Sequence, residues 1–145
     1  MSPHAYASPR QRIEAECARR GRLAFVRGCA ELILGEDGDP ALIVVLGAGH
    51  AQHILDDGVP DDQEYWLRVW AARGLLWVWD DVGTDAIRQA LDDPAWRVRE
   101  MAAKVVARHQ LGDLLPVVVV LRTDPVDRVR SAANRAVAAL TRAGA

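Results

Sequence analysis

Residues 93–106 and residues 124–137 carry the same pattern of side chains at a constant 31-residue offset. Each copy opens with Asp-Pro, continues to a Val-Arg pair flanked by arginine, and then places small or aliphatic side chains at helical spacing. A fainter copy precedes them, from Asp62 to Leu75. Three copies at a period of roughly 20 to 50 residues indicate a repeat protein, in which each unit buries its apolar face against its neighbour.

Each copy predicts a helix with a defined start. Asp93 and Asp124 are placed to act as N-caps, because their carboxylates can accept first-turn amide hydrogens, and the proline after each suits the first helical position. In the fainter copy Asp61 or Asp62 takes this place, with Glu64 as a capping-box partner. Apolar side chains then form one stripe along the helix, which in the middle copy is Val98, Met101, Ala102, Val105 and Val106.

A second, shorter helix is predicted between the copies. The segments "GTDAIRQALDD" and "GDLLPVVVVLRTD" each begin with glycine and lead to the next aspartate. The valine run in the later segment has high strand propensity, but the 31-residue period around it demands a helix. The repeat unit is therefore expected to be a pair of helices.

Helix pairs of this length, with an Asp-Pro entry and a Val-Arg dipeptide, resemble HEAT-like repeats of the PBS-lyase type. The resemblance covers residues 61–145 as about two and a half units. It implies an all-α fold, a short right-handed α-solenoid of HEAT-like helix pairs, with first helices on the convex side and second helices on the concave side. It also implies that Arg68, Arg99 and Arg130 are structural and make hydrogen bonds between repeats.

The chain of 145 residues, half of them hydrophobic, is expected to form a single domain. Residues 1–60 are expected to be irregular helices that cap the stack: one from residue 8, one over about 22–34, and one or two over 40–55. No apolar run approaches the ~20 residues of a membrane helix. A cytoplasmic location away from membranes is therefore expected.

Charge is distributed unevenly, although the net charge is only −2. Residues 1–34 carry six basic and three acidic side chains, residues 35–93 carry three and thirteen, and residues 94–145 carry nine and four. The acidic middle would repel nucleic acid laid along the whole molecule. A protein partner is therefore expected in preference to nucleic acid.

One motif begins like a cofactor site without completing it. Residues 41–50, "ALIVVLGAGH", end in Gly-x-Gly as a dinucleotide-binding loop does, but Gln52 stands where the third small residue is required. The two glycines, Gly47 and Gly49, are instead interpreted as breaks between short helices. No small-molecule cofactor is expected.

Two histidines give only a weak indication of a metal site. His50 and His53 stand three residues apart, and Asp57 follows one helical turn later. Imidazoles at this spacing can share a metal with a carboxylate, but no further ligand is recognisable in the sequence. The preferred interpretation is an exposed polar helix face, with no metal site and no catalytic group.

The segment "WDDVG", residues 79–83, resembles the Trp-Asp-x-Val-Asp signature of HEAT-like alkylpurine DNA glycosylases. In that family the tryptophan packs on DNA and the final aspartate is catalytic. Trp79, Asp80 and Val82 match the signature, but Gly83 stands in the catalytic position, and Asp81 or Asp85 would substitute only in a rebuilt turn. The alternative function is thus a nucleic-acid-binding or vestigial glycosylase-like module that uses Trp79, Trp96 and Arg97.

The favoured function is a non-enzymatic protein-interaction scaffold that presents a concave surface formed by residues 83–92 and 112–122. Aligning Leu91 with Leu121 predicts the packed side of the two second helices, which is Ile87 and Ala90 in one and Val117 and Val120 in the other. The outward side is then polar in the first helix and mostly aliphatic in the second, so either a partner or the last helix of the chain must cover it. The predicted partner-binding residues are Arg88, Gln89, Asp92, Leu115, Val118, Val119 and Arg122.

Overall fold

A computed structural model describes residues 7–36, 38–58 and 63–143 of the protein, and these contain helices and turns but no strand. The helices are α1 Pro9–Arg20, α2 Arg22–Ile33, α3 Pro40–Gly47, α4 Gly49–Asp57, α5 Tyr65–Trp77, α6 Thr84–Ala90, α7 Trp96–His109, α8 Leu115–Val120 and α9 Asp127–Ala143. The predicted all-α class is confirmed, and so is the helix over the valine run, which is α8. Asp61 and Asp62, predicted as caps, lie outside the described residues.

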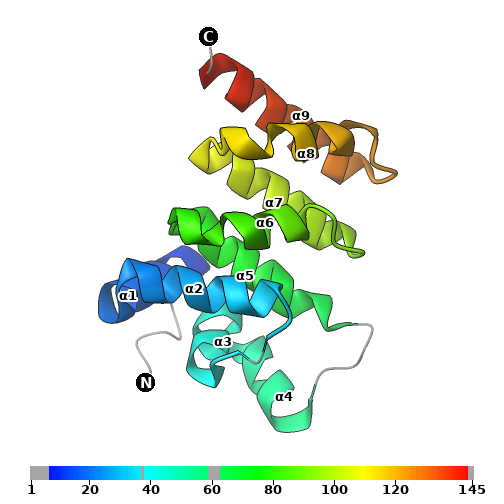
Figure 1. Ribbon diagram of the computed structural model, residues 1–145. Helices are drawn as coiled ribbons and strands as arrows, with labels where there is room; N and C mark the ends of the chain where they lie inside the picture. Colours follow the sequence, from blue (N-terminus) through cyan, green and yellow to red (C-terminus); the bar gives the residue numbers. More distant parts are fainter. Residues whose placement is uncertain (1–6, 37, 59–62, 144–145) are drawn as a thin grey trace.

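The helices form two layers (Figure 1). The first layer stacks α5, α7 and α9, with α7 packed between the other two, and the second layer contains α2, α6 and α8. Each first-layer helix is followed along the chain by a second-layer helix, so α5 pairs with α6 and α7 pairs with α8. This is the stack of helix pairs that the 31-residue period predicts.

The N-terminal helices extend the stack more regularly than the sequence suggests. The α2 helix packs on both α5 and α6, and α1 also contacts α5, so α1 and α2 behave as a further pair (Figure 1). Ser8 starts α1 with a capping box, in which its hydroxyl accepts from the Gln11 amide at 3.1 Å. The short helices α3 and α4 are inserted before α5. The helical conformation is interrupted between them at Ala48, where φ is +50°. The break predicted near Gly47 and Gly49 is confirmed.

The core lies between the two layers. The predicted stripe of α7 is buried, apart from Met101, which is half-buried. The equivalent side chains of α9 are buried as well, including Val129 and Ala133. Second-layer residues Ile87 and Leu114 close the core from the other side. Each helix pair therefore buries apolar surface mainly against its neighbours, as stacked repeats must.

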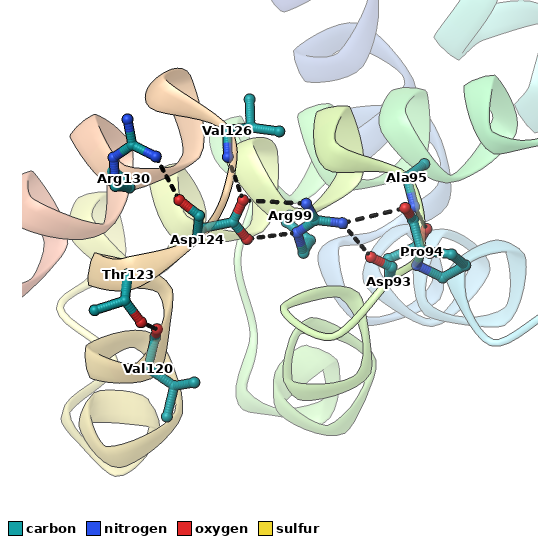
Figure 2. A network of polar contacts seen from close by, with 9 residues as sticks. All are labelled: Asp93, Pro94, Ala95, Arg99, Val120, Thr123, Asp124, Val126 and Arg130. Carbon is teal, nitrogen blue, oxygen red and sulfur yellow. Dashed lines mark hydrogen bonds and ion pairs between the residues drawn. The ribbon is translucent and has the colours of Figure 1, made fainter.

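A ladder of arginine and aspartate side chains joins successive repeats. Arg68 Nε donates to Asp93 Oδ2 at 2.7 Å, and one repeat later Arg99 Nε donates to Asp124 Oδ2 at 2.8 Å. Arg99 Nη1 also donates to the Asp93 carbonyl oxygen at 2.8 Å, and Arg130 donates to the Asp124 carbonyl oxygen at 2.6 Å (Figure 2). The hydrogen bonds between repeats expected for Arg68 and Arg99 are confirmed, whereas Arg130 bonds within its own repeat.

The aspartates of the ladder also start the next first-layer helix, although not as simple N-caps. Asp93 Oδ1 accepts from the Ala95 amide at 2.8 Å, and Asp124 Oδ1 accepts from the Val126 amide at 2.9 Å (Figure 2). The backbone of Ala95 is extended, and α7 begins only after it. The prediction that proline occupies the first helical position is therefore wrong, because the proline and the residue after it form a bend that precedes the helix.

The ladder makes the stability of the protein depend on pH. Burial alone would raise the pKa of Asp124, but hydrogen bonds from Arg99 and the Val126 amide, with the charges of Arg99 and Arg130, lower this pKa below its usual value. Because the pKa is lower in the folded chain, the ionised carboxylate contributes its full stability above about pH 4. That contribution is lost as the pH falls from there through the lower folded pKa.

We expect Asp124→Asn to remove this part of the acid sensitivity. The free energy of unfolding, measured in urea from about pH 6 down to about pH 3, should fall less steeply for the variant than for the wild type. Asp92→Asn is the control, because Asp92 is exposed and lies outside the ladder. Parallel curves for the wild type and Asp124→Asn would show that the ladder does not stabilise the ionised carboxylate.

A candidate binding groove in the second layer

A groove of about 660 Å³ lies between the second-layer helices α6 and α8. Its polar side carries Arg88, Gln89 and Asp92, which are all exposed. Its apolar side carries three residues of α8: Pro116, Val117 and Val120. The base is formed by buried residues, among them Leu91, Asp93 and Leu121.

Val120 is 68% exposed, the highest value among the large hydrophobic side chains of the described residues. Its neighbour Val118 is fully buried, so the sequence-based alignment of the second helices is wrong by one residue. The 31-residue period holds through both helices and places Ile87 on Val118 and Ala90 on Leu121, which are all buried. A shift of one residue rotates a helical position by about 100°, which exchanges the packed and outward sides.

The predicted partner-binding residues therefore do not all lie in the groove. Arg88, Gln89 and Asp92 line the groove, whereas Val118 belongs to the core. Leu115 is half-buried, and Val119 and Arg122 are exposed without lining the groove. Arg122 instead donates from Nε to Asn134 Oδ1 of α9 at 3.1 Å.

Pro116, Val117 and Val120, which form the apolar side of the groove, are not among the predicted partner-binding residues. The signal for this side was present, because the 31-residue period applied without a shift turns Val120 outward. Two charges beside the groove are already paired. Arg88 Nη1 donates to Asp85 Oδ1 at 2.6 Å, and the Asp93 carboxylate is held by Arg68. Gln89 and Asp92 remain as exposed polar groups for a bound molecule.

A family model for HEAT repeats matches residues 57–138, more than half of the chain. The chain belongs to the HEAT-repeat family. No curated protein and no solved structure matches it. HEAT repeats generally act as protein-interaction scaffolds, and their all-helical fold is typically non-catalytic. The resemblance inferred from the Asp-Pro and Val-Arg positions is confirmed.

The residues predicted for the alternative nucleic-acid-binding site do not all lie together in the HEAT-repeat stack. Trp79 stacks on His109, the last residue of α7, with ring centroids 5.3 Å apart, whereas Trp96 is the first residue of that helix. A helix of this length holds its ends about 20 Å apart. The guanidinium groups of Arg97 and Arg128 lie over the Trp96 ring, 4.4 Å and 5.2 Å from its centroid. The structure does not bring Trp79, Trp96 and Arg97 together as one site.

The turn that resembles the glycosylase signature has no carboxylate in the catalytic position and little room for one. Gly83 is buried, and a Cβ atom there would lie 3.0 Å from Cζ3 of Trp79 and 3.2 Å from Cγ1 of Val26. Asp81 accepts from Trp79 Nε1 at 3.3 Å, and Asp85 pairs with Arg88. The geometry of this turn therefore lends no support to glycosylase chemistry.

The two histidines of α4 are exposed, as the sequence interpretation expects. His53 Nδ1 lies 3.7 Å from Asp57 Oδ2, and both histidines border a cleft of about 850 Å³ against Trp66 and Trp70 of α5. Within the described part of the chain, no group of three or more His, Cys, Asp and Glu residues is arranged to hold a metal ion. Nor does any described helix have the length and apolar character needed to cross a membrane.

We expect that Gly83→Asp, which restores the glycosylase signature, destabilises the chain. The side chain would displace Trp79 and bury a charge, at a cost of at least about 2 kcal/mol. Gly83→Ala is the matched control because it adds the Cβ atom without the carboxylate. Urea denaturation followed by tryptophan fluorescence measures both effects, and a Gly83→Asp variant as stable as the wild type would contradict this packing.

Proposed function

We propose that this HEAT-repeat chain is a non-enzymatic scaffold that binds a protein partner in the groove between α6 and α8. The groove lies on the second-helix layer, which the family resemblance assigns to the concave side. The proposal retains the cytoplasmic location expected from the sequence. It rests on one observation above all, the exposed apolar side chain of Val120 at the edge of a groove that also presents polar groups.

The composition of the groove favours a peptide segment as the ligand. An apolar side chain of the partner would pack against Val117 and Val120, and full burial of a valine-sized side chain contributes about 1.5–3 kcal/mol. Polar groups of the same segment would meet Gln89 and Asp92 on the opposite side. An apolar anchor beside polar contacts that fix its orientation is the usual arrangement at the centre of protein interfaces.

The same groove does not favour nucleic acid. It presents the exposed carboxylate of Asp92, and the one basic side chain among the described residues that line it, Arg88, is paired with Asp85. Phosphate groups would gain little from such a surface, because their binding depends on several cations. The groove therefore supports the protein-binding function in preference to the nucleic-acid alternative.

We expect Val120→Asp to weaken partner binding without unfolding the chain. The added charge would face an apolar side chain of the partner, but it stays in water in the free protein because Val120 is exposed. Val119→Asp is the matched control: Val119 is 41% exposed on the same helix and does not line the groove. Both variants should keep thermal midpoints close to that of the wild type.

The measurement is affinity capture from the native cell extract with quantitative mass spectrometry, followed by calorimetry on the captured partner. Val120→Asp should weaken binding at least about tenfold, which corresponds to about 1.4 kcal/mol, while Val119→Asp should leave it unchanged. If a folded Val120→Asp retains every partner at wild-type affinity, the groove is not the binding site. Loss of binding in Val119→Asp alone would place the site on the other flank of α8.

A further inference from the structure

A second groove, of about 590 Å³, lies on the first layer between α7 and α9. Lys104 and Arg108 line it from α7, and Arg135 and Arg142 line it from α9. None of the described residues that line this groove is acidic. It therefore differs in charge from the second-layer groove, and a different set of helices forms it.

Apolar side chains, most of them small, line the groove together with these cations. They are Ala107 on α7, Ala132, Ala138 and Ala139 on α9, and Leu76 at the end of α5. Alanine side chains allow the backbone of a bound segment to approach closely, and they offer it apolar surface. The groove thus combines an apolar floor with a basic rim.

The carboxylate that lies nearest to Lys104 is engaged by a second cation. Glu100 lies 3.9 Å from Lys104 Nζ, but it is buried and accepts from Arg128 Nε at 2.9 Å. Arg108 lies over the ring of Trp77 at 4.7 Å, and this uncharged partner leaves the positive charge of the guanidinium in place. The rim therefore keeps a strong positive charge that favours an acidic ligand.

The repeat aligns these cations in a row. Arg73, Lys104 and Arg135 follow one another at the 31-residue period and occupy the same position of α5, α7 and α9. At the first of these positions a helix of the chain itself covers the row. Arg73 Nη2 donates to the carbonyl oxygen of Leu46 at the C-terminal end of α3, at 2.6 Å. The C-terminal end of a helix carries partial negative charge, so the chain already docks an electronegative helix end on the equivalent cation.

We propose that the groove between α7 and α9 binds an acidic, amphipathic helix of a protein partner. Lys104 and Arg108 are four residues apart on α7, and Arg135 and Arg142 are seven apart on α9, which spaces them by about 6 Å and about 10 Å along the helices. Glutamates at positions i, i+4 and i+7 of a partner helix have the same spacing. Its apolar residues would pack on the alanine floor in a helix-in-groove arrangement.

A peptide helix fits this groove better than nucleic acid does. Binding of single strands relies on aromatic side chains that stack with bases, and no aromatic residue is among the described residues that line the groove. A phosphate backbone would also gain nothing from the alanine floor. The acidic helix uses both the charge and the apolar surface.

The test uses a labelled synthetic peptide of about 18 residues, or five helical turns, with glutamates on one face and leucines beside them. A peptide of the same composition, shuffled so that the glutamates no longer share a face, is the control for net charge. A DNA duplex of equal charge is the control for nucleic acid. Fluorescence anisotropy gives the affinities at about 0.05 M and about 0.3 M NaCl.

The wild type should bind the ordered peptide at least about tenfold more tightly than the shuffled peptide or the duplex, and less tightly at the higher salt. The double variant Arg135→Glu, Arg142→Glu should lose at least about tenfold in affinity. The matched control Arg27→Glu, Arg122→Glu makes the same change in net charge at exposed positions that line neither groove, and it should keep the affinity of the wild type within about twofold.

If the double charge reversal in the groove prevents folding, Arg135→Gln removes one charge from an exposed position and should still weaken the ordered peptide severalfold. Equal binding of the ordered and shuffled peptides would overturn the proposal, as would full binding by the folded groove variant. Tighter binding of the duplex, lost in the groove variant, would replace the acidic helix with nucleic acid.

Discussion

The stack depends on the contact between an arginine of one repeat and the aspartate that opens the next. Asp124 makes three such hydrogen bonds. Its carboxylate accepts from Arg99 of the preceding repeat and from the Val126 amide of its own repeat, and its carbonyl oxygen accepts from Arg130. The Arg99 side chain is 14% exposed and that of Asp124 only 5%. Buried charges of this kind stabilise a structure only while all their hydrogen bonds are made, so the ladder fixes one relative placement of neighbouring repeats.

The fixed geometry of the repeats also determines which side chains line the two grooves. Because the 31-residue period holds through both layers, Val118 must point into the core, and Val120 is left facing the groove beside α6. The same period places Lys104 and Arg135 side by side on the opposite layer. One repeating backbone thus presents an apolar and polar groove on one layer and a basic groove on the other.

Much of the fold was predictable because it follows from local signals repeated at a constant offset. The helix pairs and the helical valine run derive from that offset, and the structural role of the arginines was implied by the resemblance to HEAT-like repeats. The N-terminal pair was harder to predict, because α1 opens with Ser8 rather than aspartate and the inserted helices α3 and α4 interrupt the period.

The candidate site was predicted only in part. Arg88, Gln89 and Asp92 were found from their outward positions, but the alignment of Leu91 with Leu121 departed from the period and exchanged the roles of the valines. Trp79 stacks on His109, and Arg128 lies over the ring of Trp96. Both contacts join distant parts of the chain and form only through tertiary packing, so the sequence pattern does not reveal them. The Gly83 contact with Trp79 is likewise a property of the folded turn.

The ladder couples neighbouring repeats energetically, and a double-mutant cycle on Arg99 and Asp124 measures this coupling most directly. The free energies of unfolding of Arg99→Ala, Asp124→Ala and the double variant should reveal a coupling of about 1–3 kcal/mol. The same cycle on the exposed pair of Arg88 and Asp85, within one helix, should give no more than about 0.5 kcal/mol. Additive effects at Arg99 and Asp124, within about 0.5 kcal/mol, would contradict the account.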